Sequence, residues 1–299
     1  MMEIQWKDIE LEDKELIQSY YKKEQSRSCD FTFGNNVLWS PFFQLRYAIV
    51  EGALVFLSGE QHCSVSFPLG KEHVKEAVEA LVAYFEEQGW SFRMYSVTPE
   101  QFEVLEELFP GSFEIAYERD AADYIYESEK LMNLSGKKLH SKRNHINKFL
   151  SEHEDWSFEF ITPENRAECV EMVQKWREMN DCTGNQKKCN ELCVTLRSLE
   201  KLEELGLTGG LIRLDGRVIA VSVGEACCDD TFVVHIEKAY ADIPGAYPMI
   251  NQQFVKHAAA DYRYINREDD AGEEGLRKAK LSYHPAFMQE KGTVTKKKA

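Results

Sequence analysis

The sequence predicts an α+β protein made of two tandem domains, on two observations. At 299 residues, with 43% hydrophobic and 12% aromatic residues, the chain has the composition of a folded protein and exceeds an ordinary single domain in length. Its two halves also repeat one order of elements without evident sequence identity: hairpin, strand, helix, strand, helix, strand.

The first half opens with an amphipathic helix over Lys7–Tyr21 and an aromatic, turn-rich connector over Phe31–Phe43. Apolar segments on both sides of Glu51-Gly52 are typical of a hairpin, at Gln44–Val50 and Ala53–Leu57. Strands and helices then alternate: a strand at Cys63–Phe67, a helix at Lys71–Gln88, a strand at Trp90–Val97, a helix at Pro99–Phe109 and a strand at Ser112–Tyr117.

Periodicity is lost near Tyr126–Gly136, which places the boundary between domains 1–130 and 131–299. The second half begins with three helices, at Lys137–Leu150, Glu164–Asn180 and Lys187–Leu205. The repeated order follows: a hairpin around Asp215-Gly216, a strand at Thr231–Ala239, a helix containing Ile250 and Ala258, a strand at Tyr262–Ile265, a helix capped by Asp269 and Asp270, and a strand at Ala286–Gln289.

The composition excludes several classes of function. A net charge of −15 argues against general binding of nucleic acid or anionic membrane, since both need a positive field. The amino terminus is acidic and no apolar run could span a bilayer, so we expect a cytoplasmic protein without a targeting signal. The cysteines lack CxxC pairs and predict reduced thiols, although Cys189 and Cys193, four residues apart, have the spacing of two metal ligands.

Two stretches carry a resemblance to a known family. They read EKAYADIPGAYPMINQQF from Glu237 to Phe254 and YINREDDAGEEGLRKAKLSYHPAF from Tyr264 to Phe287. Both resemble signatures of a bacterial family related to the phosphatidylglycerol lysyltransferase C-terminal domain (DUF2156-like). The resemblance implies two tandem GNAT-like (acyl-CoA N-acyltransferase) domains, each a mixed, mostly antiparallel twisted sheet flanked by helices. It also implies transfer of an acyl or aminoacyl group to an amine or hydroxyl, although fold alone does not settle a reaction.

We place the site in the second domain, because only there do polar residues crowd the strand ends; the first domain is expected to be structural. The resemblance makes Glu237 the leading general base, and the alternative is an ion pair with a basic residue such as Arg217 on a neighbouring strand. Tyr283 is similar in position to the tyrosine that acts as the acid for the leaving group. The alternative interpretation is that Tyr283 is an aromatic residue of the core whose hydroxyl has a polar partner.

Substrate contacts are expected from charged and polar groups after the Tyr262–Ile265 strand and from the basic helix at Lys137–Leu150. That helix has two readings, a solvated basic face or a cationic wall for an anionic substrate. The candidate substrate-binding residues are Lys142, Arg143, Asn266, Arg267, Glu268, Asp269, Arg277 and Lys280.

The donor is left open between acyl-coenzyme A and aminoacyl-tRNA, with no tightly bound cofactor and no metal. Gly245, Ala246 and Tyr247 form the candidate loop for a donor pyrophosphate, but Pro244 and Pro248 lack the N–H groups that such a loop uses. An aminoacyl-tRNA would need basic surface, which the sequence offers at 137–148 and 296–298. The poor loop also favours an alternative, a non-catalytic binding or scaffold protein that keeps the GNAT fold.

Overall fold

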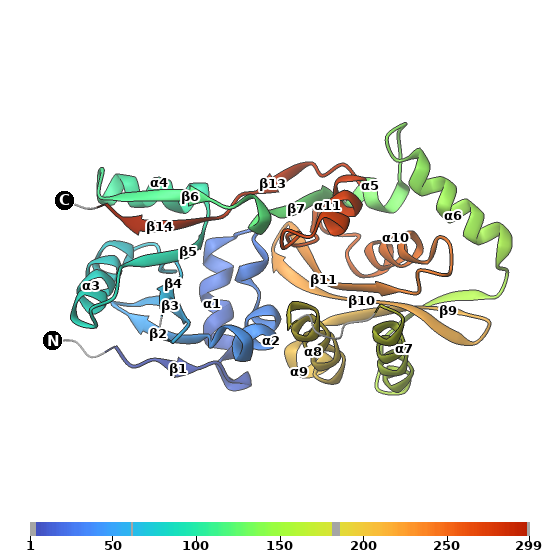
Figure 1. The fold of residues 1–299 in the computed structure, drawn as a ribbon, viewed down its shortest axis with the longest axis horizontal. Coiled ribbons are helices and arrows are strands. Elements are labelled where there is room, and N and C mark those ends of the chain that lie inside the picture. Colours follow the sequence, from blue (N-terminus) through green and yellow to red (C-terminus); the bar gives the residue numbers. More distant parts are fainter. Residues whose placement is uncertain (1–3, 61, 181–185, 298–299) are drawn as a thin grey trace. The chain divides into compact units, whose positions relative to one another are not determined.

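The computed structural model describes residues 4–60, 62–180 and 186–297, which form two compact units, each with its own sheet (Figure 1). Unit 1 comprises Met1–Asp123, Asp269–Gly272 and Met288–Ala299, and unit 2 comprises Tyr124–Glu268 and Glu273–Phe287. The observed units therefore differ from the predicted division at 130/131, because residues 124–130 belong to unit 2 and residues 269–272 and 288–299 belong to unit 1. The cause is strand β14 (Gly292–Lys296), which pairs with β5 (Arg93–Val97) and β6 (Phe113–Tyr117) and so joins the first sheet.

In unit 1 the strand order is β1-β2-β3-β4-β5-β14-β6. The predicted hairpin is present, with Glu51 and Gly52 both at positive φ in its turn. The remaining bounds are β1 (Lys7–Asp8), β2 (Arg46–Val50), β3 (Ala53–Ser58) and β4 (Ser64–Val65), with helices α1 (Lys14–Glu24), α2 (Phe33–Phe43), α3 (Val74–Glu87) and α4 (Pro99–Leu108).

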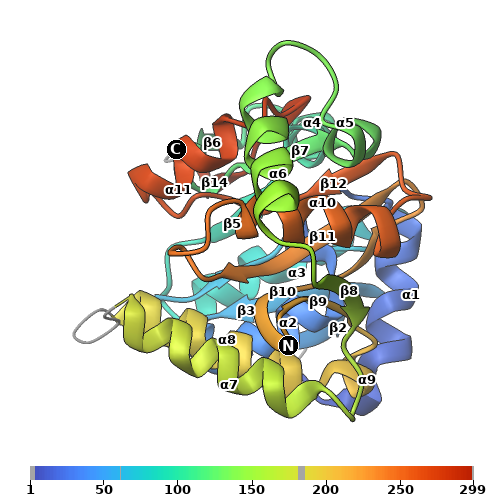
Figure 2. The same cartoon turned by 90° about the vertical axis from the view of Figure 1, so that its right-hand side faces the viewer.

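In unit 2 the order is β13-β7-β12-β11-β10-β9-β8. The strands are β7 (Asp123–Glu127), β8 (Trp156–Phe160), β9 (Thr208–Leu214), β10 (Arg217–Cys228), β11 (Thr231–Ala239), β12 (Tyr264–Asn266) and β13 (Phe287–Gln289). The helices are α5 (Ser128–Asn133), α6 (His140–Glu152), α7 (Arg166–Met179), α8 (Gln186–Glu200), α9 (Leu202–Leu205), α10 (Ala246–Ala258) and α11 (Glu274–Leu281). Helix α10 packs on one face of β9, β10 and β11, and α7 covers the opposite face (Figure 2).

Among the described strand pairings, each sheet has one parallel pair and the others are antiparallel, so the expected mixed, mostly antiparallel sheets are confirmed. The pairs are β4 with β5 in unit 1 and β11 with β12 in unit 2. Ligands in open sheets commonly bind outside the carboxyl ends of parallel strands, where the chain reverses its direction of winding. Both units therefore contain one place of this kind.

Several local predictions were wrong. The helix expected over Lys7–Tyr21 begins only at Lys14, and Lys7–Asp8 forms strand β1. The expected connector at Phe31–Phe43 contains helix α2. Pro41 has no N–H to donate to the carbonyl oxygen of Val37, and that oxygen instead accepts the hydroxyl of Ser40 over 2.9 Å. Asp269 and Asp270 do not cap the following helix, which begins at Glu274. Their carboxylates instead accept the N–H groups of Ala271 and Gly272, because short acidic side chains readily close such turns.

Candidate active site

A buried ion pair lies where β11 and β12 separate. Their ladder ends at the pairing of Val233 with Asn266, and β11 continues to Ala239. The side chain of Arg267 contacts the part of β11 that no longer pairs with β12, and its Nη2 donates to Glu237 Oε1 over 2.8 Å. The two side chains are only 11% and 13% exposed, so each charge depends on the other for compensation. Glu237 is thus ion-paired as the alternative reading required, but with Arg267 rather than Arg217.

Asn251 on α10 is the third member of the cluster. Its Nδ2 donates to Glu237 Oε2 over 2.9 Å, so each carboxylate oxygen receives one hydrogen bond. Within the described ranges, Asn251 Oδ1 and Arg267 Nη1 are buried and have no hydrogen-bond partner. Buried polar atoms nearly always have a hydrogen-bond partner. An acceptor and a donor without partners, one on each neighbour of the Glu237 carboxylate, therefore indicate a binding position for a further polar group.

Aromatic rings enclose the guanidinium. Arg267 Cζ lies 4.7 Å from the ring centre of Tyr283 and 5.6 Å from that of Tyr126. Lys142 Nζ, from α6, lies 4.3 Å from the centre of the Tyr283 ring, so this candidate lies beside the cluster. Burial, aided by the Arg267 charge, lowers the pKa of Lys142, whereas burial raises the pKa of Tyr283 and keeps its hydroxyl protonated.

Two of the predicted substrate-binding residues support the backbone instead. Lys280 is 8% exposed, and its Nζ donates to the carbonyl oxygen of Arg267 over 2.6 Å. Its own carbonyl accepts the hydroxyl of Tyr126 at 2.7 Å. Asn266 is fully buried and its Oδ1 accepts the N–H of Glu268 at 2.6 Å. Both residues therefore fix the chain that presents Arg267.

Glu268 belongs to a second polar cluster, with Glu225 on β10 and His235 on β11. Its Oε1 lies 2.7 Å from His235 Nδ1, and Glu225 Oε1 lies 3.1 Å from His235 Nε2. Burial alone would lower the pKa of His235, but the hydrogen bonds to Glu225 and Glu268 raise it to about 10. The imidazole is therefore a cation held between two carboxylates, one of them adjacent to Arg267 in sequence.

Three further candidates do not join this cluster. Arg143 Nη1 donates to the carbonyl oxygens of Leu134 and Gly136, which fixes the loop before α6. Asp269 belongs to the segment grouped with unit 1 and closes a turn at Ala271. Arg277 lies on α11, where its N–H donates to the Glu273 carbonyl.

The candidate pyrophosphate loop fits its ligand poorly. Gly245 precedes α10 at φ +92, and a Cβ there would lie 2.7 Å from the carbonyl oxygen of His145 on α6. The N–H of Ala246 already donates to Ile243, and the hydroxyl of Tyr247 is 3.1 Å from Trp176 Nε1. A phosphate cradle uses consecutive open N–H groups, and the engaged N–H of Ala246 interrupts such a series.

Asn251 and Tyr126 are the site residues that the sequence reasoning missed. Asn251 stands among apolar residues on the buried face of α10, and that polar exception in a core stripe was the available signal. Tyr126 lies in the region interpreted as the domain boundary, and no sequence signal marks it as a site residue. The described residues contain no group of three metal-ligating side chains, Cys189 and Cys193 included.

In the described ranges, no helix has the length and apolarity needed to cross a bilayer.

Comparisons with known proteins bear on both fold and family. A crystal structure of a conserved protein of unknown function from Bacteroides thetaiotaomicron is 36% identical, covers 99% of this chain and 100% of that one, and superimposes with a TM-score of 0.94. The structure of L-PGS from Bacillus licheniformis shares the fold, with a TM-score of 0.65 at 13% identity over 96% of this chain and 93% of that one.

A curated relative, the uncharacterized protein MYCGA3080 of Mycoplasmoides gallisepticum, is 28% identical over 181 residues, which are 58% of this chain and 56% of that protein. The chain thus spans about half the length of this relative. The two mixed sheets and the likeness to solved structures confirm the predicted tandem GNAT-like fold. The sequence profile described as phosphatidylglycerol lysyltransferase, C-terminal, matches residues 21–294, so the chain belongs to that family.

Proposed function

We propose that the protein transfers an aminoacyl group from an aminoacyl-tRNA to an amine or hydroxyl, at the cluster of Glu237, Arg267 and Asn251. The observation that carries the proposal is the pair of buried open atoms beside Glu237, namely Arg267 Nη1 and Asn251 Oδ1 within the described residues. A donor aimed into a buried site suits a developing oxyanion, and an acceptor suits the N–H or O–H of the attacking group.

Each step of the transfer has a candidate residue. Glu237 receives one hydrogen bond on each oxygen, which leaves lone pairs to accept the proton of the nucleophile. The nucleophile then forms a bond to the ester carbonyl carbon, and Arg267 Nη1 stabilises the negative oxygen. As the carbon–oxygen bond to the ribose breaks, Tyr283 supplies the proton of the leaving hydroxyl. Tyr283 then regains a proton from solvent, and Glu237 releases to solvent the proton that it took from the nucleophile.

The choice of donor rests on the family and on the loop at Gly245. The family is named for a lysyl transfer, and the crowding of Gly245 by His145 together with the engaged N–H of Ala246 disfavours a pyrophosphate. Exposed Lys137, Lys138 and Lys148 on and before α6 give local positive charge for a nucleic-acid donor in a chain of net charge −15. A tRNA-dependent reaction would place the protein in the cytoplasm.

The test offers lysyl-tRNA and, separately, acetyl-coenzyme A to the purified chain, with ethanolamine and glycerol as surrogate acceptors. We expect lysyl product from lysyl-tRNA above the uncatalysed rate. Arg267→Met should reduce that rate by about 10²–10³-fold, the usual effect of losing one oxyanion donor. Arg263→Met is the matched control, since Arg263 is exposed on the neighbouring loop.

Three outcomes would contradict the proposal. Equal rates for Arg267→Met and Arg263→Met would remove Arg267 from the reaction. Product from acetyl-coenzyme A and none from lysyl-tRNA would show that the donor is an acyl-coenzyme A. Binding of neither donor by a folded chain would favour the scaffold protein.

A further inference from the structure

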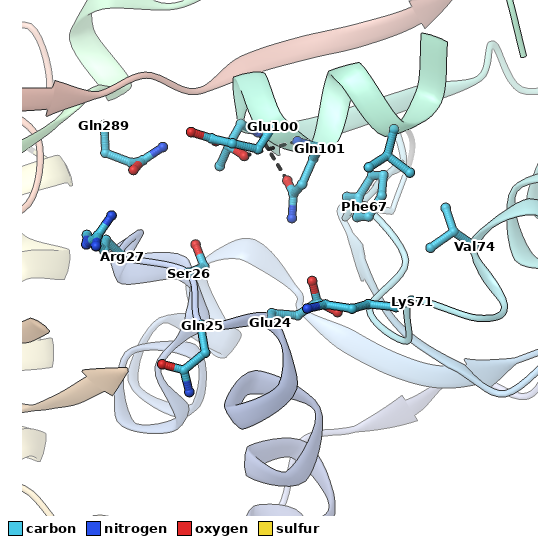
Figure 3. Close-up of a pocket in the computed structure, with 12 residues that line it drawn as sticks. Glu24, Gln25, Ser26, Arg27, Phe67, Lys71, Val74, Glu100, Gln101 and Gln289 are labelled. Atoms are coloured by element: carbon cyan, nitrogen blue, oxygen red, sulfur yellow. Dashed lines mark hydrogen bonds between the residues drawn. The ribbon is translucent and has the colours of Figure 1, made fainter. Parts of the chain in front are cut away.

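A cavity of about 480 Å³ lies entirely within unit 1 (Figure 3). It opens between the end of α1, the loop that follows β4 and the first turns of α4. The volume is in the range of pockets that bury a small organic ligand, ~300–1,000 Å³. Its lining residues come from distant parts of the chain: Glu24, Gln25, Ser26, Arg27, Phe67, Lys71, Val74, Thr98, Glu100, Gln101, Val104 and Gln289.

The cavity lies beyond the carboxyl ends of the two parallel strands of this sheet. Strands β4 and β5 are its parallel pair, and they pair only at Val65 and Met94. After Val65 the chain follows β3 instead, since Leu69 and Leu54 exchange backbone hydrogen bonds. Ser96 on β5 has φ +52, which breaks the extended strand on the other side. In unit 2 the corresponding space holds Arg267 and Glu237, whereas in unit 1 it remains open.

The charges of the lining balance. Arg27 and Lys71 supply two cations, and Glu24 and Glu100 supply two carboxylates. A polyanion such as a pyrophosphate would meet both acids, so a balanced lining favours a ligand that carries one charge of each sign. Burial raises the pKa of Glu24, against the opposing effects of Lys71 and the Gly70 N–H, so this carboxylate has lost part of its water.

The start of α4 gives a second argument against an anion. Pro99 has no N–H, and the N–H of Gln101 donates to Thr98 Oγ1 while Gln101 Oε1 accepts the N–H of Thr98. The missing N–H of Pro99 and the engaged N–H groups of Thr98 and Gln101 therefore reduce the donors available to a phosphate. Carboxylate binding in the cavity falls to the side chains of Lys71 and Arg27.

One wall of the cavity is apolar. Phe67 and Val74 are buried and Val104 is at its rim. We propose that the cavity binds a short zwitterionic peptide with an apolar side chain, whose ammonium faces Glu24 and Glu100, whose carboxylate faces Lys71 and Arg27, and whose side chain packs on Phe67. A free apolar amino acid has the same chemistry and is the other source to be distinguished.

The test is calorimetric titration of the full chain with leucyl-leucine, with no donor present, so its result is independent of the proposed transfer. We expect saturable binding, and at least about tenfold weaker binding of N-acetyl-leucyl-leucine and of leucyl-leucinamide, because each loses one charge-assisted contact. Free leucine that binds as tightly as leucyl-leucine would identify the amino acid as the source. Pyrophosphate is the anion probe.

Two variants assign the contacts. Glu24→Gln should abolish the preference for leucyl-leucine over its N-acetyl form, and Lys71→Met should abolish the preference over the amide. Glu15→Gln on α1 and Lys75→Met on α3 are matched controls, because both residues are exposed outside the cavity. The proposal is overturned if leucyl-leucine does not bind, if blocked peptides bind equally well, if pyrophosphate binds in its place, or if folded Glu24→Gln and Lys71→Met keep both preferences.

Discussion

The guanidinium of Arg267, just after β12, donates to the carboxylate of Glu237 on β11 over 2.8 Å, although the two strands are no longer paired at that point. The ladder of β11 and β12 ends before either residue, so a side-chain ion pair spans the opening that backbone hydrogen bonds leave. Removing either charge leaves the other buried without compensation, which costs more than an exposed pair would. The proposed function and the stability of the fold are therefore coupled in this pair.

Glu237→Gln is expected to reduce transfer by about 10²–10⁴-fold per folded molecule, because the amide cannot take the proton of the nucleophile. It should also lower stability by up to about 3–5 kcal/mol, because Arg267 loses its counter-charge. Activity and the urea midpoint are measured on the same preparation. Adding Arg267→Gln should recover part of the stability and none of the activity; additive losses of stability would show that the two residues are energetically independent.

Lys280→Met is expected to lower kcat by about 10- to 100-fold through displacement of Arg267. The sequence suggested a substrate contact, for which KM would rise with kcat nearly unchanged. The ammonium of Lys280 instead binds the carbonyl oxygen of Arg267. Steady-state kinetics separates the two roles, and Lys278→Met, at a side chain 75% exposed on the same helix, serves as the control. A pure KM effect would restore the substrate role.

Gly245→Ala is expected to destabilise the protein by about 1–3 kcal/mol. The residue has φ +92, and a methyl group would lie 2.7 Å from the carbonyl oxygen of His145, a backbone atom that cannot rotate away. Chemical denaturation measures the change. Gly275→Ala is the control, because a Cβ there meets nothing within 4 Å. Equal effects of the two substitutions would show that the contact with α6 is not tight.

Local sequence signals predicted the elements well where a residue type favours one backbone conformation, as glycine does in a turn with positive φ. Asp215-Gly216 and Glu51-Gly52 mark hairpins because both turns use positive φ. Strand β14 was missed because it is a short polar segment whose partners, β5 and β6, are distant in sequence. No pattern within Gly292–Lys296 specifies that pairing.

In the candidate site, too, local signals identified some residues, whereas contacts that depend on the tertiary fold were not predicted. Arg267 follows a strand directly and so was found as a candidate, but its pairing with Glu237 depends on where the ladder ends, which no local pattern specifies. The cavity of unit 1 was not predicted, because Glu24, Gln101 and Gln289 become neighbours only through the tertiary fold. The expectation that unit 1 is purely structural stays a prediction that the peptide titration tests.

His235 is expected to make stability fall as pH rises from about 6.5 to 10. Its folded-state pKa is raised to about 10 from an ordinary 6.5 by Glu225 and Glu268, so the folded protein holds a proton that the unfolded chain releases in this window. The contribution is complete below pH 6.5 and is lost as pH rises through the folded pKa, with a slope of up to about 1.4 kcal/mol per pH unit. Urea denaturation at several pH values measures it.

The comparison must be with His235→Gln, because Cys228 acts in the opposite direction. Its pKa is lowered from 9 to about 7, chiefly by a hydrogen bond from Cys227, so its contribution is present above pH 9 and is lost as pH falls through 7. Between these values it makes stability rise with pH and partly hides the effect of His235. The difference in stability between wild type and His235→Gln should therefore shrink as pH rises, in the Cys228→Ser background as well. A difference that stays constant with pH would mean that His235 is neutral and that its contacts with Glu225 and Glu268 are ordinary hydrogen bonds.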